Sequence, residues 1–114
     1  MLAKVTTLAA EERQATALLI VLLAELDARR LYLAEGYSSL FAYCTKALLL
    51  SEHAAHQRIE AARASRTFPE LLQLLSEGAL TLATLALLAP HLTAQNHRDL
   101  LDKTRSRASG QSKK

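Results

Sequence analysis

The chain has 114 residues, of which 50% are hydrophobic, and a formal net charge of +3. This length supports one domain with its own core, and the abundance of alanine and leucine, with only three glycines and two prolines, predicts an all-α fold. The single cysteine, Cys44, excludes an internal disulfide and is typical of a reducing cytoplasm, where we expect the protein to be found.

The first predicted helix begins after Thr6 or Thr7, either of which can cap it, and runs to about Leu33. Its most apolar stretch, residues 15–24, is roughly half the length of a membrane span, so no membrane association is expected. Acidic residues precede that stretch where a secretion signal would be basic. The stretch is apolar almost all round, so either the rest of the domain or a second copy must bury it. A homodimer through this helix is therefore predicted.

Five shorter helices are predicted to follow. Gly36 interrupts the first pattern, the third helix covers residues 52–66, the fourth ends at Gly78, and Pro90 terminates the fifth. Each of the five begins at a residue that can cap a helix, and these residues are Ser38 or Ser39, Ser51, Thr67 with Glu70 as a capping box, Thr81, and Thr93. The prediction is a compact bundle of about six helices over residues 1–105, followed by a flexible basic tail, 106–114.

The second and third predicted helices have the spacing of a helix-turn-helix, which we place at residues 39–66. In such a motif the second helix lies in the major groove of DNA. Polar residues of the third helix fall on one arc, where glutamine can read adenine, arginine can read guanine or hold phosphate, and the capped N-terminus can accept phosphate. The candidate DNA-binding residues are Ser51, His53, His56, Gln57, Arg58, Arg63 and Arg66.

The alternative interpretation of the same pattern is an amphipathic helix with a solvated face. Glu52 and Glu60 lie on the proposed arc and count against tight phosphate binding, so only a modest, salt-sensitive affinity is expected. Basic residues near the C-terminus could add phosphate contacts: Arg98, Lys103, Arg105, Arg107, Lys113 and Lys114.

No catalytic or cofactor motif is found. His53 and His56 could share a metal ion, but Cys44, His91 and His97 are not at zinc-ligand spacing from them, so no metal site is predicted. The sequence contains no glycine-rich phosphate loop and no nucleophile motif. We therefore expect no catalytic residue, no cofactor and no small-molecule substrate.

Between Arg29 and about Leu101 the chain resembles the helical N-terminal region of bacterial proteins labelled HNH endonucleases. The resemblance is carried by RRLYLAEGYSSLFAYC, LSEHAAHQRIEAARASRTFPELLQLL, EGALTLATLALLAPHLT and NHRDLL. A looser likeness connects the same stretch to the helix-turn-helix core of ParB-type partition proteins. Both resemblances imply a DNA-binding domain.

The chain departs from the longer HNH-type proteins after residues 96–98, because a Ser/Lys-rich tail follows and no His-Asn-His metal motif does. Asn96 beside His97 is not such a motif. The nuclease activity that the family label implies is therefore not carried over. The predicted function is DNA binding without catalysis, and the alternative is a protein-interaction or dimerisation module that does not bind DNA.

Overall fold

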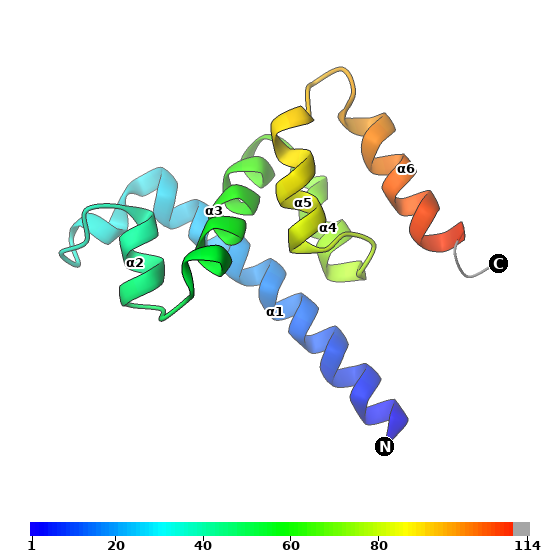
Figure 1. Cartoon of the computed structure of the whole chain (residues 1–114), viewed down its shortest axis with the longest axis horizontal. Helices are drawn as coiled ribbons and strands as arrows, with labels where there is room; N and C mark the ends of the chain where they lie inside the picture. The colour runs from blue at the N-terminus through cyan, green and yellow to red at the C-terminus, as the bar shows by residue number, and fades with distance from the viewer. Residues whose placement is uncertain (111–114) are drawn as a thin grey trace.

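Six α-helices occur in residues 1–110, the part of the chain described by a computed structural model, which places the side chains of residues 1–104 (Figure 1). No strand occurs in this part, so the predicted all-α fold is confirmed. The helices are α1 (Leu2–Arg29), α2 (Leu40–Lys46), α3 (Glu52–Thr67), α4 (Glu70–Glu77), α5 (Leu82–Leu88) and α6 (His97–Gly110), with two short 3₁₀ helices, η1 (Leu31–Leu33) and η2 (Ala89–His91).

Helix α3 lies at the centre of the bundle and contacts α1, α2, α4 and α5. Most of its buried residues are small, which lets several neighbours approach its backbone closely: Ala55, Ala61, Ala62 and Ser65. The buried Ser65 hydroxyl donates a hydrogen bond to the carbonyl of Ala62 at 2.9 Å, so it is satisfied within the helix. The neighbouring helices supply the large core side chains, including Ile20, Leu23, Leu40, Leu71, Leu74 and Leu85.

The predicted bounds of α1 are wrong at both ends. The helix begins at Leu2, and Thr6 and Thr7 lie inside it, where their hydroxyls donate to carbonyls four residues earlier instead of capping. It ends at Arg29, because Arg30 has a positive φ of 52° and its N–H turns back to the carbonyl of Asp27.

The predicted capping box at the start of α4 is also wrong. Thr67 is the last residue of α3, and α4 follows Pro69 without a side-chain cap. The buried Phe68 occupies the corner between the two helices, and its carbonyl accepts the N–H of Leu71 at 3.1 Å. The carboxylate of Glu70 lies instead 3.1 Å from Nε2 of His97, so it connects α4 to α6.

The predicted caps of α2, α3 and α5 and the predicted end of α4 are confirmed, whereas α5 ends at Leu88 before Pro90, and α6 begins only at His97. Ser39, Ser51 and Thr81 each accept the backbone N–H three residues on, at 3.0 to 3.1 Å. Gly78 closes α4 with a φ of 84°. Before α6, Thr93 and Asn96 cap each other's backbone N–H groups. Helix α6 continues through residues 106–110, part of the predicted tail, and residues 111–114 lie outside the described structure.

The N-terminal third of α1 projects from the bundle (Figure 1). All side chains of residues 1–9 are exposed, and the first buried residue of the helix is Ala17. The radius of gyration is 15.3 Å, whereas a compact domain of this size has a radius of gyration of about 13 Å. The projecting end of α1 contributes to this difference. None of the described helices is both long enough and apolar enough to cross a membrane.

Leu85 and Leu87 of α5 provide a matched test of this core. Leu85 is fully buried, whereas Leu87 is 74% exposed. We expect Leu85→Ala to lower the free energy of unfolding by about 2–5 kcal/mol, because it leaves a cavity among packed side chains, and Leu87→Ala to change it by less than about 0.5 kcal/mol. Urea unfolding followed by circular dichroism measures both. Equal losses for the two variants would contradict the described packing of α5.

Candidate nucleic-acid interface

The α2–α3 pair forms the centre of the predicted interface. The two helices contact each other and are joined by residues 47–51. Leu49 adopts a left-handed conformation in this connection, with a φ of 60°, and its side chain is 82% exposed. The turn of a helix-turn-helix often contains glycine, which adopts this conformation without a steric cost. Leu49 therefore adopts this left-handed conformation at a cost in backbone strain.

The first two turns of α3 present polar groups to solvent. Ser51 caps the helix, and the side chains of Glu52, His53 and His56 are exposed. Gln57 is half-buried on the edge of the same surface. With the described residues, His53, His56 and Gln57 form no side-chain hydrogen bond or ion pair, so their polar atoms remain available to an external ligand.

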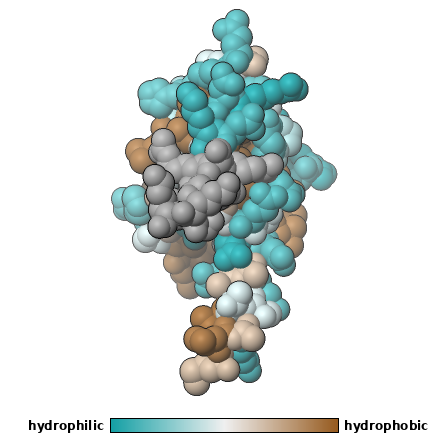
Figure 2. All heavy atoms as spheres, turned by 90° about the vertical axis from the view of Figure 1, so that its right-hand side faces the viewer, coloured by the Kyte–Doolittle hydropathy of each residue, from teal (hydrophilic) through white to brown (hydrophobic). Residues whose placement is uncertain are grey.

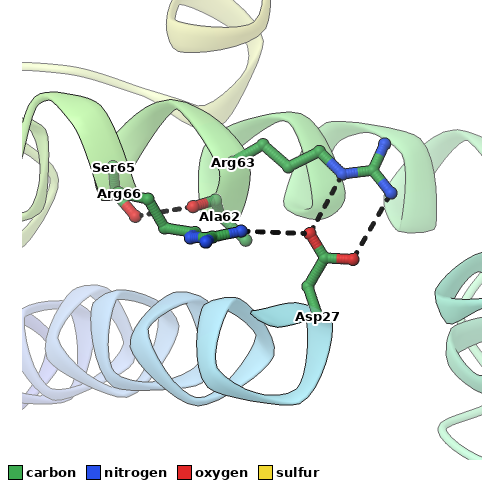
Figure 3. Close-up of polar contacts among 5 residues, drawn as sticks. All are labelled: Asp27, Ala62, Arg63, Ser65 and Arg66. Atoms are coloured by element: carbon green, nitrogen blue, oxygen red, sulfur yellow. Dashed lines mark hydrogen bonds and ion pairs between the residues drawn. The ribbon is translucent and has the colours of Figure 1, made fainter. Parts of the chain in front are cut away.

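The structure places Arg63 and Arg66 differently from the sequence prediction, because both point toward α1 (Figure 3). Nε of Arg63 donates to Oδ2 of Asp27 at 3.2 Å, and its Nη2 lies 3.5 Å from Oδ1. Nη1 of Arg66 lies 3.9 Å from the same carboxylate. Both guanidinium groups are therefore ion-paired within the chain, although the two arginine side chains remain 57% and 52% exposed.

Asp27 is the residue that sequence reasoning missed. Its side chain is only 13% exposed, and it follows Ile20 and Leu23 at the spacing of one helix face. That spacing was the available signal, because a carboxylate on a buried face requires a cationic partner. The hydrogen bond from Arg63 to Asp27 also raises the pKa of the arginine above its already high ordinary value.

Arg58, another candidate DNA-binding residue, folds back on its own helix. Its Nη1 donates to the carbonyl of Ala54 at 3.1 Å, and the side chain is half-buried near the thiol of Cys44. Burial raises the pKa of Cys44, and the positive charge of Arg58 opposes that shift. Cys44 therefore remains a neutral thiol of the core.

A shallow hollow of about 330 Å³ separates the N-terminal end of α2 from α3. Its walls are both apolar and polar, with Tyr32, Phe41 and Ile59 beside His56, Glu60 and Arg63. His56 lines this hollow and also belongs to the exposed polar surface at the start of α3. The candidate interface therefore has a concave part beside the exposed face of the helix.

The charges around α3 nearly cancel. The acidic groups are Asp27, Glu52 and Glu60, and the basic groups are Arg58, Arg63 and Arg66, of which two are held by Asp27. Arg98 and Lys103 of α6 are exposed, and the side chains of the remaining predicted tail cations lie outside the described residues. Among described residues, no group of three or more potential ligands could hold a metal ion.

No protein family matches the chain, and no significant match is found among curated proteins or solved structures.

The Asp27 cluster can be tested against an exposed ion pair on the same helix. Glu25 lies 3.5 Å from Arg29, with both side chains more than half exposed. We expect Asp27→Ala to lower the free energy of unfolding by about 1–2 kcal/mol, because two guanidinium groups lose a partly buried partner, and Glu25→Ala by less than about 0.5 kcal/mol. Chemical denaturation at low salt compares the two. A loss for Asp27→Ala no larger than that for Glu25→Ala would contradict a structural role.

The backbone of Leu49 gives a test that depends on the sign of an effect. At this positive φ we expect Leu49→Gly to be more stable than Leu49→Ala by about 1 kcal/mol. At His56, an exposed position inside α3, His56→Gly should be less stable than His56→Ala by about 1 kcal/mol. Thermal and urea unfolding of the four variants measure both differences. The same sign at both positions would show that Leu49 is not left-handed in solution.

Proposed function

We propose that this chain is a DNA-binding helical domain without chemistry of its own, and that the first two turns of α3 form its reading surface. The observation that carries the proposal is the set of unpartnered polar side chains, His53, His56 and Gln57, beside the Ser51-capped N-terminus of a helix held against α2. Donors and acceptors on the first turns of the second helix are what a helix-turn-helix inserts into the major groove.

The rigidity of α3 supports this assignment. The helix is packed on several sides, so its exposed turns are held in one orientation by the core. A side chain on such a support loses little freedom when it meets a base edge, which favours specific contacts.

The charge distribution limits the affinity that we propose. Because Asp27 is ion-paired with both Arg63 and Arg66, its negative charge offsets part of the positive charge that α3 offers to a phosphate backbone. Exposed cations on other elements include Lys46 at the end of α2, and Arg98 and Lys103 on α6. Fewer phosphate contacts mean weaker binding and a smaller dependence on salt. Base and groove contacts of the α3 residues then contribute a larger share of the binding energy.

Binding is tested by fluorescence anisotropy of labelled duplex DNA titrated with the full chain at low and at near-physiological salt. We expect salt-sensitive binding, and a loss of about tenfold in affinity for the His56→Ala/Gln57→Ala double variant, because two groove contacts are removed. Gln95→Ala is the matched control, since Gln95 is an exposed residue of the loop before α6. Its affinity should equal that of the parent chain.

Two outcomes contradict the proposal. The first is the absence of binding at low salt on random-sequence and palindromic duplexes. The second is binding that the double variant leaves unchanged, which would move the interface away from α3. In the first case the chain is better described as an interaction module without DNA, an alternative favoured by the exposed apolar surface of α1.

A further inference from the structure

Leu49, in the connection between α2 and α3, combines a left-handed backbone with a side chain that is 82% exposed. Apart from glycines, the described residues with a positive φ are Leu49 and Arg30, so Leu49 is the only hydrophobic one. Exposure alone is common here, since several apolar side chains lie along α1, whose projecting end shows brown and pale spheres at the bottom of Figure 2. Those side chains belong to a regular helix, which has no backbone strain, so Leu49 requires a separate explanation.

The turn explains the backbone of residue 49 but not its side chain. Leu48 and Leu50, on either side, pack against the core, and the N–H of Leu50 donates to the carbonyl of Cys44 at 3.1 Å. A glycine at position 49 would adopt the left-handed conformation without a steric cost. The leucine side chain adds strain and, being exposed, gives no packing to the core in return. Strained residues of this kind cluster at sites that bind a ligand.

Leu49 borders the proposed reading surface. It lies two residues before Ser51, so the two Cα atoms are at most about 7 Å apart. The connection closes the end of the α2–α3 pair at which the first turns of α3 begin (Figure 1). A side chain at this place reaches the major groove together with those turns. Base-pair edges present one apolar group in that groove, which is the C5-methyl group of thymine.

We propose that Leu49 contacts the C5-methyl group of a thymine at the edge of the site that α3 reads, and that this contact determines part of the sequence preference. The inference rests on the proposed function, because it requires the first turns of α3 to lie in the major groove. An apolar contact suits this surface, since the charges around α3 nearly cancel and the exposed Glu52 repels phosphate.

Deoxyuridine tests the contact, because it differs from thymidine only in lacking this methyl group. Duplexes that the full chain selects from a random-sequence pool are made once with thymine and once with deoxyuridine, and fluorescence anisotropy at low salt compares their affinities. We expect the parent chain to bind the deoxyuridine duplex about fourfold more weakly, which is the effect of one buried methyl group. Replacement of one thymine at a time should confine this loss to one or two adjacent positions at an edge of the site.

Substitutions of Leu49 separate the contact from the stability of the fold. We expect Leu49→Gly and Leu49→Ala to bind the thymine duplex at least about fourfold more weakly than the parent chain, and to bind both duplexes equally. The two variants should lose the same affinity although they differ in stability, so the loss follows the side chain. Leu49→Met keeps an apolar side chain and should bind within about twofold of the parent chain. Leu87→Ala is the matched control, since Leu87 of α5 is 74% exposed, and it should bind as the parent chain does.

The outcomes distinguish this inference from the proposed function. A parent chain that binds no duplex at low salt overturns both. The inference alone is overturned if His56→Ala/Gln57→Ala weakens binding while Leu49→Gly does not, or if the parent chain binds thymine and deoxyuridine duplexes equally. It is also overturned if Leu49→Gly still distinguishes the two duplexes as the parent chain does, because another residue would then contact the methyl group.

Discussion

The close packing of α3 against four other helices is the constraint on which the rest of the structure depends. Alanine and serine on the buried sides of α3 leave room for α1, α2, α4 and α5 to approach one axis. Larger side chains at these positions of α3 would push the four neighbouring helices away from it. The leucines of those helices would then lose their contacts in the core. A set of helices with little intrinsic stability thus becomes one cooperative core, because α1, α2, α4 and α5 all pack against the same central helix.

The same packing determines which polar residues remain available. Because α1 crosses α3 near its C-terminal half, Asp27 meets Arg63 and Arg66, and these two cations form ion pairs that connect α3 to α1. The N-terminal half of α3 has no such neighbour on its outer side, and His53 and His56 stay exposed there. One helix is therefore divided into a structural half and a half that can serve recognition, and the dividing line is set by the position of α1.

The sequence by itself determined the all-α class, a helix over residues 52–66 and most helix ends, because Ser39, Ser51, Gly78 and Thr81 act through bonds within a few residues. It did not determine where α1 begins, since Thr6 and Thr7 can bond either as caps or inside a helix. Only the tertiary structure decided the roles of Arg63, Arg66 and Glu70. Their partners, Asp27 and His97, lie far away in the chain, and helical periodicity gives the direction of a side chain but not the residue that it meets.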